Sequence, residues 1–330
     1  KKMDKSKFEI SPIEKVIFFG GGDLMLECAK KSIKSNLDVC VFAAKRHLEE
    51  DIKQGNRYTT LRKALEKEGI MYFQENEINK SLQLQNEIND GTIGIGMGEI
   101  YTFSKDTINL FSGKLFDLMT IRLPQYRGGA HFTWQILRNS KIGAWCIQLI
   151  NEEMIPGVFD SGQILAEKEY IIPDTARKPS DFFDIAFDEG LKLFTAFLDK
   201  IKTGHSFELS NLQENFRSYF PRLNTLEHGY INWSWNSHEI EKFVCAFDNP
   251  YPGASTFLQG EKVFLKNCQS EYSEGKFHPF MSGLIYRKDK DFITVACRDG
   301  SLIIRRVLND KQKDIISSLT VGQRFYTPIK

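Results

Sequence analysis

The sequence has 330 residues, and its 44 Lys and Arg against 43 Asp and Glu leave a formal charge of +1. The length is enough for two domains of ordinary size, and the charge balance gives no overall field that would attract nucleic acid or an anionic membrane. Apolar residues make up 41% and charged residues 26% of the chain. These fractions are those of an ordinary globular protein, which excludes the disordered and collagenous classes. No apolar run approaches the about 18 residues of a membrane span, which excludes the membrane-spanning class.

The first elements along the chain predict a strand, a tight turn and a helix. Residues 16–19 form a short apolar run that meets three glycines at 20–22, and Asp23 then opens a segment with helical apolar spacing. Such a turn can cradle the phosphate of a nicotinamide cofactor in an oxidoreductase. The full Gly-x-Gly-x-x-Gly spacing is absent, however, because Met25 takes its last position. We therefore interpret the turn as structural.

Further apolar runs follow, separated by polar segments long enough for helices. They cover residues 39–44, 71–73, 93–97, 115–119 and 144–150. This alternation predicts an α/β protein with a parallel sheet. Apolar steps of three and four over 179–202, beginning at Phe183, predict a long helix packed on that sheet.

After residue 204 the pattern changes, and from residue 226 onward short strand-like runs alternate with turn signals. We therefore predict a Rossmann-like α/β domain over residues 1–205, a linker over 206–225 and a smaller, β-rich C-terminal domain over 226–330.

The six cysteines are scattered, without a Cys-x-x-Cys pair. This pattern favours buried thiols in a reducing compartment over disulfides or a zinc site. The first 14 residues are charged and lack the apolar core of a secretory signal. We expect a cytoplasmic protein with no bound metal.

The stretch 111–134, FSGKLFDLMTIRLPQYRGGAHFTW, holds most of the candidate functional residues. A strand here leads into an irregular loop with a proline and paired glycines, and a helix is expected to start near His131. Ligands of parallel α/β sheets bind at the carboxyl ends of the strands. This loop is therefore where we expect a binding site.

This stretch resembles the folate-dependent formyltransferase family, which includes methionyl-tRNA formyltransferases and sugar N-formyltransferases. The likeness is carried by Leu123, Pro124, Tyr126, Arg127, Gly128 and Trp134, together with the loop 157–165, GVFDSGQIL. Segments 231–234, 247–254 and 321–325 are similar to the C-terminal domain of that family. The resemblance thus extends over residues 15–328.

The resemblance implies an N-formyltransferase that uses 10-formyltetrahydrofolate as its formyl donor and needs no metal. The likeness is greatest to the sugar N-formyltransferases, which implies a nucleotide-linked amino sugar as the acceptor and a role in the synthesis of cell-surface polysaccharides. A homodimer is a further family expectation. Residues 226–330 hold 14 Lys or Arg against 12 Asp or Glu, which is less basic than RNA binding favours.

Two of the three catalytic residues of the family are replaced in this chain. The family Asn, which donates to the formyl oxygen, falls on Asp117, and the family His, which removes a proton from the attacking amine, falls on Met119. The family Asp falls on Asp160. Losing a general base costs about 10² to 10⁴ in rate, and losing an oxyanion donor costs about 10² to 10³. Either other groups have taken over, or the chain is an inactive relative that binds folate or a nucleotide-sugar.

His131 is the best substitute for the missing base. A helix N-terminus disfavours the imidazolium ion, so we expect a neutral His131 that can act as a base near pH 7. Asp117 is either the base itself or a protonated carboxyl that donates as the Asn does. Asp160 is expected to position the amine. The structural alternatives are a backbone-bonded His131, an inert Asp117 and a loop-capping Asp160.

The resemblance also implies which residues contact the two ligands. Donor contacts fall on Met97, Gly98, Tyr101, Leu123, Pro124, Arg127, Gly128 and Asp160. Met97 takes the place of a family Tyr, so its contact is expected through the backbone. In segment 216–222, Tyr219 is expected to stack on a nucleotide base and Arg222 to meet a phosphate, unless this segment is only an ordered linker.

Overall fold

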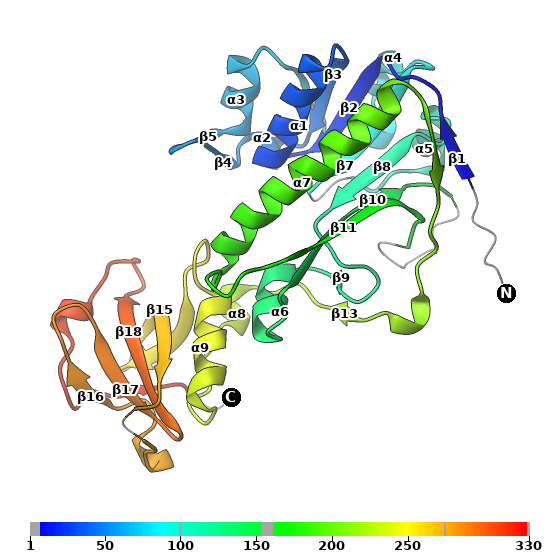
Figure 1. Ribbon diagram of the computed structural model, residues 1–330. Coiled ribbons are helices and arrows are strands. Elements are labelled where there is room, and N and C mark those ends of the chain that lie inside the picture. Colours follow the sequence, from blue (N-terminus) through cyan, green and yellow to red (C-terminus); the bar gives the residue numbers. More distant parts are fainter. Residues whose placement is uncertain (1–6, 99–100, 153–160, 274, 329–330) are drawn as a thin grey trace. The chain divides into compact units, whose positions relative to one another are not determined.

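Figure 1 shows a computed structural model of the chain, which describes residues 7–98, 101–152, 161–273 and 275–328. The chain divides into two compact units. The first comprises Lys1–Arg127, Gly143–Tyr170 and Ala186–Tyr219, and the second comprises Gly128–Ile142, Ile171–Ile185 and Phe220–Lys330. The domain boundaries at 205 and 226 stay a prediction.

The first unit is built around a seven-stranded sheet in the order β11-β10-β8-β7-β2-β3-β6. The strands are β2 (Lys15–Gly20), β3 (Asp38–Ala43), β6 (Met71–Gln74), β7 (Thr92–Met97), β8 (Leu115–Met119), β10 (Ile142–Leu149) and β11 (Ile164–Ile171). Strand β2 pairs in parallel with β3 and β7, and β7 pairs in parallel with β8. This confirms the Rossmann-like α/β core. Strand β10 runs antiparallel to β8, so the sheet is mixed and not wholly parallel as predicted. The prediction missed this because an apolar run does not report the direction of a strand.

Helix α7 (Pro179–Lys202) is the long helix predicted from the sequence, and it covers one face of this sheet (Figure 1). The ring centroids of Phe194 and Phe197 lie 5.9 and 5.6 Å from those of Phe18 and Phe116. Burying an aromatic side chain of this kind contributes about 1.5–3 kcal/mol. At the start of the helix, Phe182 is buried and Phe183 is 46% exposed, so the prediction that placed Phe183 on the buried face was wrong by one residue.

The opposite face of the sheet carries a second apolar cluster that includes Ile17, Phe19, Phe42 and Leu115. The rings of Tyr101 and Phe103 pack edge-on against Phe19, at 6.2 and 5.1 Å between centroids. The remaining helices of this unit are α1 (Asp23–Lys34), α2 (Lys45–Leu48), α3 (Leu61–Lys67), α4 (Leu82–Glu87) and α5 (Lys105–Leu110).

Several short elements lie outside the main sheets. They are the paired strands β1 (Lys7–Ile10) and β12 (His205–Glu208), β4 (Asp51–Gln54) and β5 (Arg57–Thr60), and β9 (Arg127–Gly128) and β13 (Tyr219–Phe220), with the 3₁₀ turns η1 (Ile78–Lys80) and η2 (Glu214–Phe216). The sequence did not predict the β4–β5 hairpin. Ile52 is its only fully buried residue, so the hairpin carries no apolar alternation to detect.

The second unit holds a six-stranded antiparallel sheet in the order β16-β17-β18-β15-β14-β19. Its strands are β14 (Ala254–Leu258), β15 (Glu261–Glu271), β16 (Ile285–Lys288), β17 (Ile293–Cys297), β18 (Gly300–Leu308) and β19 (Phe325–Tyr326). Its helical elements are α6 (His131–Leu137), α8 (Thr225–His228), α9 (Ser237–Ala246), η3 (Pro279–Met281) and η4 (Ile316–Ser318). The β-rich C-terminal domain is thereby confirmed.

Helix α9 begins with a capping box, in which Asn236 and Glu239 each accept from the other's backbone N–H. Beside it, Trp233 stacks on Phe325 with 5.8 Å between centroids, and its Nε1 donates to the Thr256 hydroxyl at 2.9 Å. A buried indole with a satisfied N–H holds this part of the second unit together.

All six cysteines are buried thiols, as the sequence indicates. No helix within the described ranges combines the length and apolarity that a membrane span requires. Across the same ranges, no group of three or more His, Cys, Asp or Glu side chains is arranged to hold a metal ion.

Gly143 on β10 gives a direct test of packing in the first unit. A Cβ atom there would lie 2.3 Å from Cζ of Tyr170 on β11. We expect Gly143→Ala to lower the free energy of unfolding by about 1–3 kcal/mol, because the packed ring has to shift. In the control Gly91→Ala, the new Cβ would meet the side chain of Glu14 at 3.2 Å and Oδ1 of Asn89 at 3.4 Å, and neither contact is with a packed ring. Urea unfolding compares the two, and equal stability of both variants would contradict this packing.

Candidate functional site

The glycine turn after β2 is closely packed. Gly20 and Gly22 have φ angles of 112° and 93°, a region that favours glycine, and a Cβ at Gly21 would lie 3.0 Å from Cβ of His47. The first helical residue is Asp23, whose carboxylate accepts from the Leu24 N–H at 3.0 Å. A carboxylate at the helix start is unfavourable for a bound phosphate. The turn thus fits a structural role.

Three predicted donor-binding residues lie at and after the end of β7. Met97 is 4% exposed, and its carbonyl accepts from the Gly21 N–H at 3.4 Å. Gly98 is exposed and has a φ of 79°. The Tyr101 hydroxyl donates to the Glu75 carbonyl at 2.6 Å, and burial raises the pKa of this phenol well above its ordinary value. The Tyr101 hydroxyl is therefore already engaged within the protein, and Gly98 offers open backbone.

Asp117 and Met119 are half-buried on β8, and they alternate with fully buried residues of that strand. Their partners on β10 are Gln148 and Cys146. Because paired residues of neighbouring strands project from the same side of a sheet, these four side chains share one face. Leu115 precedes them on that face, and α7 covers the other. Asp117 thus projects away from α7.

Gln148 is a polar residue of this site that the sequence analysis did not single out. It is 1% exposed, and its Nε2 donates to the Gly162 carbonyl at 3.0 Å. A Cβ at Gly162 would lie 2.3 Å from the Leu149 carbonyl oxygen, so this backbone runs very close to β10. Asp160 itself lies outside the described residues. The detectable signal was a single polar residue within the apolar run 144–150.

The loop after β8 carries the predicted motif from Leu123 to Gly128. The Leu123-Pro124 peptide bond is cis, and Pro124 is buried. Arg127 is only 5% exposed, and its Nη1 and Nη2 donate to the two carboxylate oxygens of Glu214 at 2.6 and 2.5 Å. Its backbone N–H donates to the Ser218 carbonyl at 3.1 Å. The guanidinium predicted to contact the donor is therefore engaged in a bidentate pair that holds segment 214–218 to this loop.

The Arg127–Glu214 pair predicts a loss of stability on mutation. Hydrogen bonding to Arg127 lowers the pKa of Glu214 below its ordinary 4.5, so this stabilisation is present above that pH and is lost as the pH falls through the lowered pKa. We expect Glu214→Gln to cost about 1–2 kcal/mol at pH 7, less than for a fully buried pair because the Glu214 side chain is 34% exposed.

Urea unfolding at pH 7 and at pH 4 measures this effect, and the difference between variant and wild type should shrink at the lower pH. Glu49→Gln is the matched control, because it removes a carboxylate that lies 3.8 Å from Lys45 in an exposed pair. If both variants lost the same stability, the bidentate pair would not hold the segment.

His131 belongs to the second unit and is the first residue of α6, as predicted. Ala130, which precedes it, has a left-handed φ of 54°. Within the described ranges, Nδ1 of His131 is buried and has no hydrogen-bond partner. Burial lowers its pKa to about 4. His131 is thus neutral at pH 7, but burial rather than the helix end is the cause, and a pKa of about 4 makes it a weaker base than the sequence predicted.

Tyr219 and Arg222 lie on either side of the boundary between the units. The side chain of Tyr219, on β13, is 67% exposed. In the second unit, the Trp134 indole donates to the Pro221 carbonyl at 2.9 Å, and a Cβ at Gly129 would lie 3.2 Å from Cα of Arg222. Gly129 thus lets the chain around Arg222 approach closely. Tyr219 is available to stack on a flat ligand.

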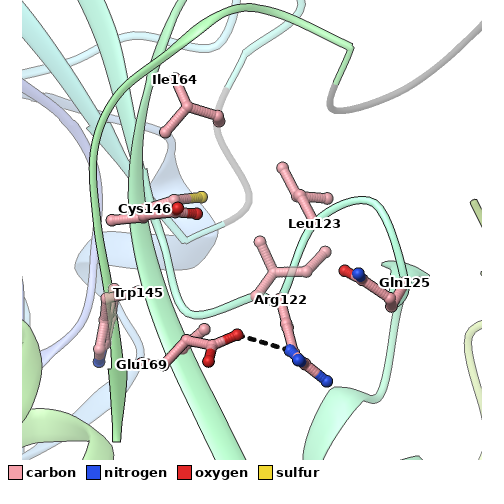
Figure 2. A pocket seen from close by; sticks show the side chains of 10 residues that line it. Arg122, Leu123, Gln125, Trp145, Cys146, Ile164 and Glu169 are labelled. Atoms are coloured by element: carbon pink, nitrogen blue, oxygen red, sulfur yellow. Dashed lines mark hydrogen bonds and ion pairs between the residues drawn. The ribbon is translucent and has the colours of Figure 1, made fainter. Parts of the chain in front are cut away.

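A pocket in the first unit is bounded by the loop 121–125, β10 and β11 (Figure 2). Its lining residues are Ile121, Arg122, Leu123, Gln125, Ala144, Trp145, Cys146, Ile164, Glu167 and Glu169. Nε of Arg122 donates to Oε1 of Glu169 at 2.7 Å. We call this cavity the β8–β11 pocket; the sequence analysis did not predict it.

Residues 224–324 match the family described as formyl transferase, C-terminal domain. A methionyl-tRNA formyltransferase of Clostridium botulinum is 24% identical over 300 residues, which cover 89% of this chain and 91% of that protein. Residues 224–324 thus carry the C-terminal domain of the formyl transferase family, and the likeness to a methionyl-tRNA formyltransferase extends over most of the chain.

Two solved structures with the formyltransferase fold are also similar. An N-formyltransferase from Helicobacter canadensis, in complex with folinic acid and dTDP-3-aminofucose, matches with a TM-score of 0.60 and 19% identity over 89% of this chain and 99% of that chain. A 4-N formyltransferase from Francisella tularensis matches with a TM-score of 0.58 and 17% identity over 77% of this chain and 97% of that chain. At these identities the likeness concerns the fold.

The replacement of two catalytic residues at Asp117 and Met119 stays a prediction from the sequence. The family resemblance aligns these positions with the Asn and His that carry out the chemistry, and a thioether has no proton to exchange. The described residues of the first unit therefore offer Asp117, Gln148 and Cys146 as the polar or polarisable side chains of that face.

Proposed function

We propose that this formyltransferase moves a formyl group from 10-formyltetrahydrofolate to the amine of a nucleotide-linked amino sugar. The amine lone pair attacks the formyl carbon, and the C=O electrons move to oxygen. The tetrahedral intermediate then collapses, the bond from the formyl carbon to N10 breaks, and tetrahydrofolate leaves. The amine loses one proton and the folate nitrogen gains one, so the reaction needs a group that moves a proton and a donor to the developing oxyanion.

The hydrogen bond from Gln148 to the Gly162 carbonyl carries the proposal. Gln148 lies opposite Asp117, and Gly162 follows Asp160 by two residues. Gly162, at the described end of the segment that resembles the family's aspartate loop, is therefore held against β10, the neighbour of the strand that carries Asp117. In the proposed reaction, Asp160 positions the amine, Asp117 serves as the oxyanion donor or the base, and His131 is the alternative base.

The residues at the carboxyl ends of β7 and β8 fit a folate donor. Leu123 offers an apolar side chain, Met97 is buried and is proposed to make its contact through the backbone, and Gly98 offers exposed backbone that can meet the edge of a pterin ring. Pro124 and Gly128 shape the loop, and Arg127 keeps that loop in place through Glu214. We therefore propose a positioning role for Arg127 and binding roles for Met97, Gly98 and Leu123, with Tyr101 beside them.

An amino sugar is favoured over methionyl-tRNA as the acceptor by charge and by exposed aromatic surface. Residues 226–330 carry an excess of only two basic residues, 14 against 12, whereas RNA binding usually relies on a strongly basic face. Tyr219 is 67% exposed, which suits stacking on a nucleotide base, and Arg222 is proposed to meet the phosphates. A homodimer and a cytoplasmic location stay predictions.

The test begins with calorimetric titration of folinic acid, a stable analogue of the donor. Turnover is then measured with 10-formyltetrahydrofolate and three kinds of acceptor: dTDP-3-aminofucose, other nucleotide-linked amino sugars, and methionyl-tRNA. Folate binding with turnover of an amino sugar supports the proposal. Turnover of methionyl-tRNA alone would show that the acceptor is methionyl-tRNA and not an amino sugar. Folate binding without any turnover would favour the inactive relative.

A further inference from the structure

The β8–β11 pocket opens on the face of the sheet that carries Asp117. Cys146 lines the pocket and is the β10 partner of Met119, while Gln148 is the partner of Asp117. Residues two apart on a strand lie on the same face, separated by about 7 Å. The pocket thus begins at the pair of Cys146 and Met119, next to the pair of Gln148 and Asp117 where the reaction is proposed to take place.

Its polar groups are mainly hydrogen-bond acceptors. Oε1 of Gln125 is buried and has no hydrogen-bond partner within the described ranges, and Figure 2 shows its carboxamide turned inward from the loop. Glu167 and Glu169 line the β11 side. A buried acceptor without a donor is unfavourable until a ligand supplies an N–H or O–H group.

The two carboxylates of the pocket differ in their partners. Glu169 receives the Nε–H of Arg122 at 2.7 Å, as the dashed line in Figure 2 shows. Glu167 makes no ion pair with any other residue that the structure describes. Lys168, between them, pairs instead with Glu189 on α7, on the opposite side of the sheet. The pocket therefore carries one uncompensated negative charge.

We propose that the β8–β11 pocket selects the acceptor: Glu167 attracts its amine in the ammonium form, and Gln125 receives a neighbouring N–H or O–H group. This inference rests on the proposed function and assigns two specificity residues to it. An amine beside hydroxyl groups satisfies both acceptors. An apolar side chain such as the thioether of methionine would leave Gln125 unsatisfied and would remove water from Glu167 without compensation.

Arg122 has a supporting role in this pocket. The family resemblance places a leucine at this position, and the pair with Glu169 holds the arginine at the pocket wall. By neutralising Glu169, Arg122 leaves a single carboxylate to recognise one amine. The pocket is thus matched to a singly charged acceptor group.

The experiment measures binding and turnover with two matched probes, a dTDP-linked 3-amino sugar and the same nucleotide-sugar with a hydroxyl in place of the amine. We expect wild-type protein to bind the amine about tenfold more tightly than the hydroxyl probe. Glu167→Gln should reduce this preference to within twofold, and Gln125→Leu should weaken binding of both probes. KM for the amino sugar should rise in both variants, and kcat should change little in Gln125→Leu, because Gln125 contacts a neighbouring group and not the reacting amine.

Asp188→Asn is the matched control, because it removes one exposed carboxylate from α7, on the far side of the sheet. Folinic acid should bind all variants equally. If Glu167→Gln keeps the amine preference, the pocket assignment is wrong, while turnover still supports the function. If no variant or wild-type protein turns over but the preference for the amine depends on Glu167, the proposed function fails and the pocket assignment stands.

Discussion

We expect Asp117→Ala to lower kcat by about 10²- to 10³-fold while folinic acid binds as tightly as to wild type. Asp117 projects from β8 on the face opposite α7, at the position where the formyltransferase resemblance has an oxyanion donor. Whether it donates as a neutral carboxyl or accepts a proton from the amine, an alanine does neither. Single-turnover formylation of the amino sugar measures the chemical step separately from product release.

Asp117→Asn separates the two roles. An amide can donate to a developing oxyanion but cannot act as a base, so retained turnover in Asp117→Asn would assign the donor role. Loss of turnover in both variants would assign the base role. If Asp117→Ala kept wild-type kcat, Asp117 would be an inert carboxylate and the proposed chemistry would have to run through other groups. Asp106→Asn, on the exposed start of α5, is the control for a loss of charge alone.

The sequence was sufficient to predict most of the fold because burial leaves clear patterns. Strands β3, β7 and β8 are almost fully buried and appear as continuous apolar runs, and α7 has a single apolar face. Strand direction leaves no such pattern, which is why β10 was expected to be parallel. The β4–β5 hairpin is largely exposed, so its residues were free to be polar.

The site was predictable in position but not in detail. The loop 123–128 was located by its proline and glycines, yet Arg127 is engaged by Glu214, which lies 87 residues away in sequence. Only the fold brings these two charges together. Likewise, the β8–β11 pocket combines a loop with two strands that follow it, and the charges of Arg122 and Glu169 look like ordinary surface charges in the sequence. Long-range pairing decides which polar residues face a ligand.

We expect the stability of the protein to fall as the pH drops from 6.5 towards 4, and His131 to cause a large part of that loss. Burial lowers its pKa from the ordinary 6.5 to about 4. Between these values the unfolded chain binds a proton that the folded protein does not, so folding becomes less favourable as the pH falls. At about 1.4 kcal/mol for each pKa unit, the full effect is about 3 kcal/mol at pH 4.

Urea unfolding of wild type and His131→Gln at pH 7, 6 and 5 measures this loss, and the variant should lose less stability. The carboxylates with lowered pKa values, such as Glu214, act below their ordinary 4.5, so they do not affect this window. His205→Gln, at an exposed position, is the control and should follow wild type. Equal losses in wild type and His131→Gln would show that His131 is protonated in the folded protein at pH 5.

The same protonation state decides what His131 can do in catalysis. A base with a pKa of about 4 is fully neutral at pH 7, but it holds a proton weakly, so it gives little driving force for taking one from an amine. We therefore expect turnover above pH 5.5 to show no titration that His131→Gln removes. A step near pH 6.5 that disappears in His131→Gln would mean that ligand binding raises the pKa of this imidazole and makes it the base. Its absence would leave the proton transfer to Asp117 or to the acceptor's own surroundings.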